Sequence, residues 1–154
     1  MSPVAKVPTG VPGLDRITHG GLPKGRTTLI TGKSGAAKSI LALQLASSLA
    51  RSGLKTVVFA VEESPADLLE SGNNLGFGLS ALVEKGTLKL TDLTRPPDTS
   101  TIVTGDYDVT AMVHRVEEAA KTFGASWKAS ARSRRRATLV ADQGRLHRPS
   151  EREG

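Results

Sequence analysis

Eight consecutive residues near the N-terminus constrain this chain more than any other part of it. They are Gly32, Lys33, Ser34, Gly35, Ala36, Ala37, Lys38 and Ser39. The stretch follows the pattern G-x-x-x-x-G-K-S/T, except that Ala37 stands where the second glycine is expected. Glycines in this pattern let consecutive backbone N–H groups curl around phosphate oxygens. The eight residues are therefore predicted to form a phosphate-binding loop that contacts a bound nucleotide.

The sequence on either side of the loop supports this interpretation. A short β-prone run at 27–31 precedes the loop, and an apolar helical stripe at 40–49 follows it. A strand, a loop and a helix in this order are the context that the pattern requires. Lys38 is then placed to neutralise the β- and γ-phosphates, and Ser39 to hold Mg²⁺. The alternative is a Gly/Ser turn that happens to contain a lysine.

Ala37 departs from the pattern by one methyl group. This methyl group is expected to lie close to a phosphate oxygen, and it restricts the backbone where glycine would be free. Phosphate contacts tolerate little displacement. We therefore expect Ala37 to reduce nucleotide affinity without removing the site.

The composition excludes several classes of protein. The 154 residues correspond to one domain, and the absence of cysteine rules out disulfides and thiolate metal sites. The first residues lack the apolar segment of a signal peptide, and no apolar run is long enough to span a membrane. We expect a cytoplasmic protein with no membrane partner.

The excess of basic residues is concentrated at the C-terminal end. Residues 1–125 contain 13 Lys/Arg and 12 Asp/Glu, whereas residues 126–154 contain 8 Lys/Arg and 3 Asp/Glu. Attraction to nucleic acid is therefore expected only from this last stretch, through arginines such as those at 134–136. The alternative is a solvated tail of low hydrophobicity.

Hydrophobic periodicity predicts alternating strands and helices. Strands are expected at 27–31, 55–62 and 87–91, and helices at 14–18, 40–52, 65–75, 79–85 and 111–123. Ser64 is expected to cap the helix that begins at Pro65, and Asp108 or Thr110 to cap the last helix. This alternation indicates an α/β fold with a parallel sheet and flanking helices.

Several motifs, in the right order, resemble the N-terminal part of a KaiC-type ATPase domain of the RecA-like group. They are T-G-V-P-G-L-D at 9–15, G-G-L-P-K-G-R-T-T-L at 20–29, the loop, V-V-F-A-V-E-E-S-P at 57–65, L-G-F at 75–77 and G-T-L at 86–88. The resemblance covers about residues 7–125. It implies a truncated RecA-like P-loop NTPase core that uses ATP and Mg²⁺. It also implies hexameric rings, with nucleotide at the subunit interfaces, when the domain is complete.

Glu62 and Glu63 stand at the end of the apolar run that begins at Lys55. They are expected to emerge at the carboxyl end of a parallel strand, where ligands bind in such sheets. Two carboxylates there can orient or deprotonate a water that attacks the γ-phosphate. The resemblance implies this catalytic role for both residues. The alternative is a solvated pair at a strand–helix junction.

The family pattern stops near Ala125. The resemblance implies a further apolar strand that ends in an aspartate bound to Mg²⁺ through water. Neither is recognisable after Ala125, and residues 139–142 are too short and wrongly placed to supply them. The chain is therefore divided into a partial ATP-binding domain at 1–125 and a basic, disordered tail at 126–154.

The sequence thus predicts an ATP-binding module of a KaiC-like ATPase. Hydrolysis and assembly into a homo-oligomer stay open, because the strand with the magnesium-binding aspartate is missing. The alternatives are a truncated, non-enzymatic fragment that interacts with other proteins, and a nucleic-acid binder that acts through its tail. Kinase activity and a circadian role are not supported by one partial domain.

We hypothesise that the reading frame changed near codon 125, because the composition changes where the resemblance stops. The coding DNA provides the test. Another frame downstream of codon 125 should encode an apolar strand that ends in aspartate. If no frame does so, the hypothesis is wrong.

Overall fold

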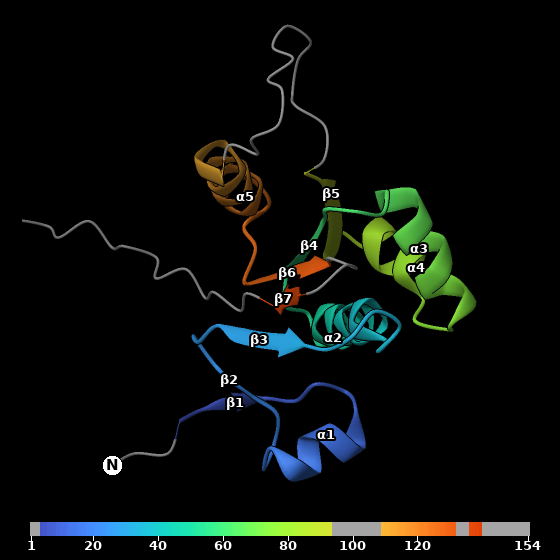
Figure 1. The fold of residues 1–154 in the computed structure, drawn as a ribbon, viewed down its shortest axis with the longest axis vertical. Helices are drawn as coiled ribbons and strands as arrows, with labels where there is room; N and C mark the ends of the chain where they lie inside the picture. The colour runs from blue at the N-terminus through green and yellow to red at the C-terminus, as the bar shows by residue number, and fades with distance from the viewer. Residues whose placement is uncertain (1–3, 94–108, 132–135, 140–154) are drawn as a thin grey trace, which may run out of the picture.

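The computed structural model describes residues 4–93, 109–131 and 136–139 (Figure 1). Its elements in chain order are β1 (Lys6–Val7), α1 (Pro12–Ile17), β2 (Leu22–Pro23), β3 (Thr28–Thr31), α2 (Lys38–Arg51), β4 (Thr56–Ala60), α3 (Pro65–Asn74), α4 (Leu79–Glu84), β5 (Leu88–Asp92), α5 (Val109–Phe123), β6 (Trp127–Ala131) and β7 (Arg136–Leu139). Within these described ranges, no helix is long and apolar enough to cross a membrane.

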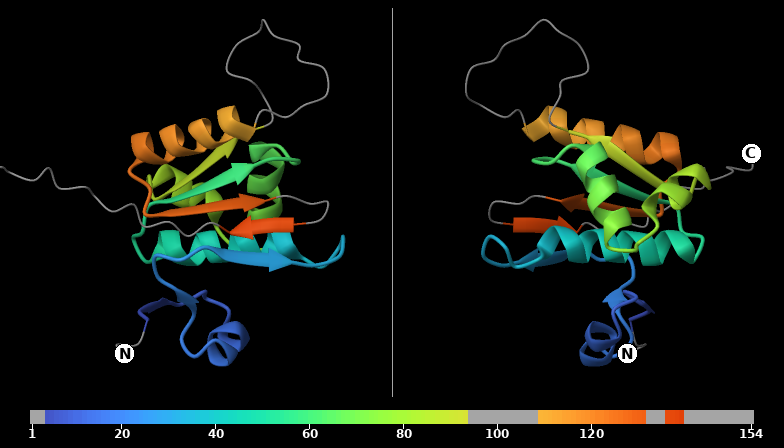
Figure 2. Two further views of the ribbon diagram at one scale, coloured as in Figure 1. Left: turned by 60° about the vertical axis from the view of Figure 1, so that its left-hand side comes forward. Right: turned by 90° about the vertical axis from the view of Figure 1, so that its right-hand side faces the viewer.

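Five strands form one sheet in the order β3-β7-β6-β4-β5. β4 pairs in parallel with β5 and β6, whereas β7 runs antiparallel to its neighbours β3 and β6. β3, β6, β4 and β5 therefore run in one direction, and their carboxyl ends lie at the same edge of the sheet (Figure 2). The predicted α/β class, a parallel sheet with flanking helices, is confirmed, with one antiparallel strand inside it.

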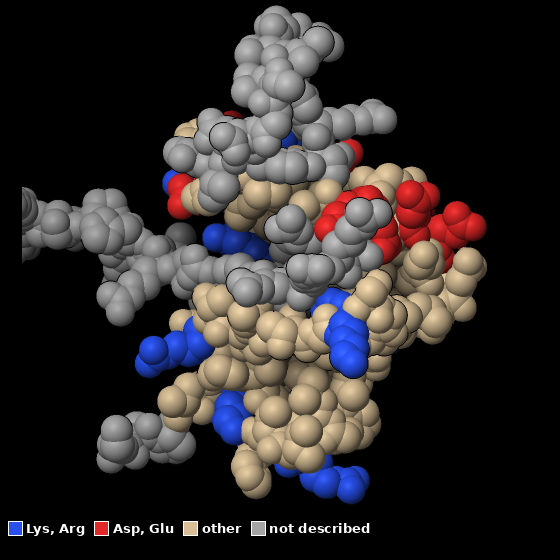
Figure 3. Space-filling view, in the orientation of Figure 1, with Lys and Arg blue, Asp and Glu red and all other residues tan. Residues whose placement is uncertain are grey.

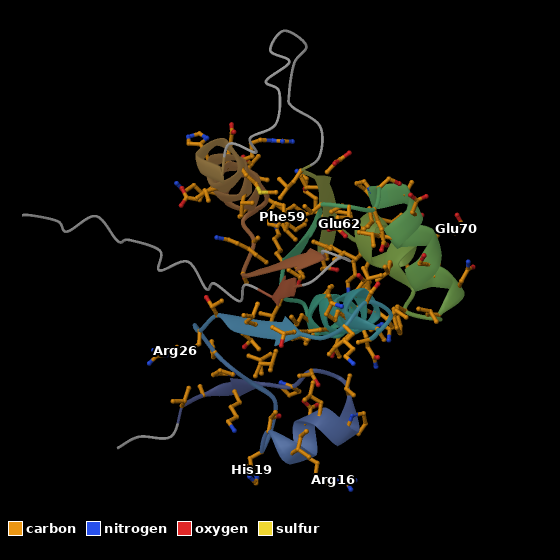
Figure 4. All side chains as sticks on the ribbon, in the orientation of Figure 1. Arg16, His19, Arg26, Phe59, Glu62 and Glu70 are labelled. Atoms are coloured by element: carbon orange, nitrogen blue, oxygen red, sulfur yellow. The ribbon has the colours of Figure 1, made fainter. Side chains whose placement is uncertain are left out.

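Helices cover the sheet on both faces. α2, α3 and α4 lie on one face and α5 lies on the other (Figures 1 and 2). β4 is buried along its whole length, and its successive side chains point to opposite faces. Val58 and Ala60 belong to the core beneath α2, whereas Val57 and Phe59 pack with α5 (Figure 4). The continuous apolar run in the sequence reflects this burial on both sides.

Local signals located the start of α3 correctly. The Ser64 hydroxyl accepts a hydrogen bond from the backbone N–H of Asp67 at 3.1 Å, and Pro65 is the first helical residue. The start of the last helix was predicted less well. α5 begins at Val109, so Thr110 lies within the helix, and the other proposed cap, Asp108, lies outside the described residues.

Two strands lie beyond Ala125, so the expectation that no strand follows this residue was wrong. β6 and β7 both belong to the five-stranded sheet. The connection between them, residues 132–135, is far shorter than the crossover that parallel pairing needs, which explains why β7 runs antiparallel. Residues 132–135 and 140–154, which make up most of the predicted tail, lie outside the described part of the chain.

The N-terminal residues form a small unit of α1 and the two-stranded sheet of β1 and β2. Thr9 is completely buried, and its backbone N–H and hydroxyl donate to Asp15 Oδ1 at 2.8 and 2.7 Å. The hydrogen bond from this N–H is the main reason why the pKa of Asp15 lies below its usual value. Gly10 has φ of +77°, and a side chain there would collide with Ser48 of α2. The unit is thereby packed closely against α2.

Candidate functional site

The eight-residue loop lies between β3 and α2, as the sequence predicts. It opens at the carboxyl edge of the sheet (Figure 2). Two of its residues have left-handed backbone conformations: Gly35, with φ of +79°, and Ala37, with φ of +55°. Gly32 is constrained by packing, because a Cβ at this position would lie 3.1 Å from the Cβ of Ala36. The loop is therefore tightly curled, and Ala37 adopts a conformation that favours glycine.

Lys38 is held inside the curl of the loop. Its side chain is 5% exposed, and its Nζ donates a 2.7 Å hydrogen bond to the backbone oxygen of Lys33. Within the described part of the chain, no carboxylate pairs with this ammonium group. A buried cation is stable only with compensating negative groups. An anion in the loop would supply the charge that the protein does not.

The N-terminus of α2 faces the same space without a cap. Ala37 occupies the cap position and offers no side-chain acceptor, and the first turn contains no acidic residue. α3 shows the opposite arrangement, with Ser64 as cap and Asp67 in the first turn. Uncapped N–H groups and the helix dipole attract an anion to the start of α2.

A cavity of about 570 Å³ adjoins the loop. It is lined by Gly35, Ala36, Ala37, Lys38 and Ser39 of the loop, by Ile40 and Leu43 of α2, by Glu63, and by Ser71, Asn74 and Leu75 of α3. The structure thus brings most of the loop and Glu63 together. The remaining predicted contacts, Gly32, Lys33 and Ser34, belong to the loop but do not line the cavity. Glu62 is exposed at the junction of β4 and α3 and is not among the lining residues (Figure 4).

Sequence reasoning missed the wall that α3 contributes. Ser71 and Asn74 are three residues apart and so lie on one face of the helix. Their spacing was visible in the sequence, but the direction of this face depends on the burial of Leu68 in the core that α3 shares with α2. The cavity wall is therefore a product of tertiary packing.

The cavity has positive charge in the loop and a carboxylate in its wall, so its electrostatics favour an anion that is bound together with a cation. Exposed carboxylates gather over α3, beside the cavity, and residues 56–84 contain no Lys or Arg (Figure 3). Glu63 lies in the cavity wall itself. Because a carboxylate repels a phosphate, a divalent cation between them would reduce this repulsion. The Ser39 hydroxyl and the Glu63 carboxylate are oxygen donors of the kind that Mg²⁺ prefers.

The protein alone forms no metal centre in the parts of the chain that the structure describes, because no three His, Cys, Asp or Glu residues lie close enough to share an ion. β6 also contains no acidic residue, so it does not provide the magnesium-binding aspartate that the family resemblance implies. A bound cation would therefore be held mainly by the phosphates of its ligand, with Ser39 as a protein donor.

Comparison with known proteins identifies the family. The family model for the KaiC ATPase matches residues 7–129, which extends the resemblance into β6. The chain is 37% identical to the circadian clock oscillator protein KaiC of a Picosynechococcus species over 123 residues, 79% of this chain and 24% of that protein. It is 36% identical to KaiC of Thermostichus vulcanus over 124 residues, 80% of this chain and 24% of the relative.

KaiC 1 of a Synechocystis species is similarly related, with 37% identity over 123 residues, 79% of this chain and 24% of the relative. The chain thus spans about a quarter of the length of the curated relatives that it matches. Because the family model covers most of the chain, this protein belongs to the KaiC ATPase family.

The left-handed conformation of Ala37 leads to a prediction about stability. A non-glycine residue in this conformation costs about 1–2 kcal/mol, and the greater entropy of glycine in the unfolded chain offsets about 0.4–1 kcal/mol. Ala37→Gly should therefore raise the free energy of unfolding by about 0.5–1 kcal/mol. Urea denaturation followed by circular dichroism measures this change.

Ala36→Gly is the matched control, because Ala36 is a neighbour of the same size whose φ is not positive. This change should lower the free energy of unfolding, since glycine gains unfolded-state entropy without relief of strain. Equal effects of the two substitutions would show that the conformation of Ala37 carries no strain.

Proposed function

We propose that this member of the KaiC ATPase family binds Mg·ATP, with its phosphates in the loop at 32–39. The observation that carries the proposal is the buried ammonium group of Lys38, which has no carboxylate partner among the residues that the structure describes. The uncapped N-terminus of α2 adds backbone N–H donors beside it. Together they form a site for several negative charges, as a triphosphate carries.

The outer part of the cavity is suited to a nucleoside. Ile40 and Leu75 are 42% and 49% exposed, and both line the cavity with the buried Leu43. Apolar surface of this kind favours the faces of a planar base. Ser71 and Asn74 lie in the same wall and offer hydroxyl and amide groups for hydrogen bonds. We infer that the ligand extends from the loop towards the last turn of α3.

Mg²⁺ would be held by the Ser39 hydroxyl and by the phosphates. The fit rests on the donor set: the Ser39 hydroxyl and the Glu63 carboxylate line the same cavity, and both are oxygen donors. Bound there, the ion supplies neutralisation of charge on the phosphates. Lys38 would orient the same phosphates from inside the loop, and Glu63 lines the same cavity.

Hydrolysis would depend on Glu63. A carboxylate in the cavity wall can accept a proton from the water that attacks the γ-phosphate. Glu62 shares this role in the family resemblance, but its position outside the cavity lining makes Glu63 the stronger candidate for the base. β6 offers no acidic residue for a magnesium ion. We therefore expect slow turnover, or turnover that requires assembly into the homo-oligomer.

Binding of Mg·ATP tests the site directly. The purified chain should bind Mg·ATP with a micromolar dissociation constant, and Lys38→Met should weaken binding roughly 10- to 100-fold. This loss corresponds to the contribution of a charged hydrogen bond, about 1.5–3 kcal/mol. Isothermal titration calorimetry measures both values.

The control for this measurement is Lys85→Met, which removes an exposed lysine beyond the end of α4. It should bind like the unmodified chain. A folded chain that does not bind Mg·ATP, or a Lys38→Met variant that binds equally well, would contradict the proposal.

Turnover tests the role of Glu63 separately. Glu63→Gln should lower the rate of phosphate release roughly 100-fold or more, as expected for loss of a general base. Its affinity for Mg·ATP should not fall, because the repulsion between carboxylate and phosphate is also removed. Glu70→Gln, which changes an exposed carboxylate of α3 outside the cavity, is the control. Unchanged turnover in Glu63→Gln would exclude it as the base.

A further inference from the structure

A second, apolar cavity lies along the outer edge of β5. Its volume is about 400 Å³, and its walls include Ala66, Leu69, Val83, Leu88, Leu90 and Phe123. We name it the β5 groove. It is formed by α3 and α4 on one side and by the end of α5 on the other, with the strand between them. The groove is thus separate from the nucleotide cavity, with which it shares no lining residue.

β5 is the last strand of the sheet in this direction, because β4 is its only strand partner among the described elements. The Thr87 carbonyl accepts from Thr56 of β4, and the Leu93 N–H donates to Ala60. In a parallel pair, alternate residues direct both backbone groups to the same side. Leu88 and Leu90 therefore direct their N–H and C=O groups away from β4, and both residues line the groove.

A strand edge without a strand partner among the described elements, with one apolar cavity along it, fits one kind of ligand. An extended peptide can add to the edge through backbone hydrogen bonds, while its alternate side chains enter the pockets. At the β5 groove, one set of side chains would face Leu69 and Val83, and the other would face Phe123. Only an extended segment can pair its backbone with the edge of β5 while its side chains enter the cavity.

Two lysines beside the groove indicate the charge of the side chain that the bound peptide presents. The Nζ atoms of Lys55 and Lys89 lie 5.4 and 6.0 Å from the centre of the Phe123 ring. In the described part of the chain, neither lysine forms an ion pair. Two cations that converge on one ring repel each other, and a carboxylate between them would relieve this repulsion. The partner should therefore place an aspartate or glutamate at this point.

A second copy of the chain does not meet this requirement. If two copies paired their β5 strands in antiparallel fashion about a two-fold axis, a side chain on one face of the sheet would lie opposite side chains on that same face only. Lys89 would then meet Thr87, Lys89, Thr91 or Leu93 of the other copy, and none of these is acidic. The charge pattern thus favours a different protein over a symmetric pair of β5 strands.

We propose that the β5 groove binds an extended segment of a partner protein, in which apolar residues alternate with polar ones and an acidic side chain pairs with Lys89. Fluorescence anisotropy provides the test. The probe is a fluorescein-labelled octapeptide of alternating valine and polar residues that include aspartate. The second probe has lysine in place of each aspartate. The full chain should bind the acidic peptide at least fivefold more tightly than the basic one, and Lys89→Glu should reverse the preference.

Ala66→Trp should abolish binding of the acidic peptide, because it fills the groove from an exposed position of α3. Ala81→Trp is the control, since Ala81 is an exposed alanine of α4 that does not line the groove. Circular dichroism shows whether each variant is folded.

Three results would overturn the proposal. One is equal binding of both peptides by the unmodified chain. Another is the absence of binding, as expected if residues 94–108 of the chain itself fill the groove. The third is concentration-dependent self-association in sedimentation equilibrium that Ala66→Trp abolishes, because it would place a second copy there instead.

Discussion

The burial of α2 determines where the other parts of this molecule lie. Most of the helix is buried, and small side chains at Ala42, Ala46 and Ala50 let the sheet and its neighbours approach closely. α3 and α4 pack against it, and the N-terminal unit contacts its outer side through Gly10. Because α2 begins at the end of the loop at 32–39, the hydrophobic packing of α2 helps to hold this loop at the carboxyl edge of the sheet.

The loop differs from the rest of the fold in how its polar groups are satisfied. At the start of α3 the chain supplies its own cap, with the Ser64 hydroxyl on the Asp67 N–H. At the start of α2 it supplies none, and it also buries Lys38 with a single carbonyl as partner. The N–H groups at the start of α3 are capped by the chain itself, whereas those at the start of α2 are not. The start of α2 therefore has free donors for an external anion. This contrast separates a ligand site from an ordinary turn.

Much of the fold was readable from the sequence because its signals are local. The strand–loop–helix order around Lys38, the cap at Ser64 and the buried strand β4 each depend on a few neighbouring residues. β6 and β7 were missed because small and polar residues such as Lys128 and Ala129 give no apolar run. β6 is a strand because it pairs with β4, which is distant in sequence. The α3 wall of the cavity was missed for the same reason.

The pairing of β3 has a consequence for folding during synthesis on the ribosome. Thr28 pairs with Leu139 and Thr31 with Arg136, so the strand before the loop finds its sheet partner almost at the other end of the described chain. Contacts between residues so distant in sequence form slowly, because the entropy cost of closing a long loop must be met before the contacts add any stability. β3 leaves the ribosome among the first elements, yet it cannot pair with β7 until that strand has been synthesised. The strand that leads into the loop at 32–39 is therefore translated early, and its partner in the sheet is translated late.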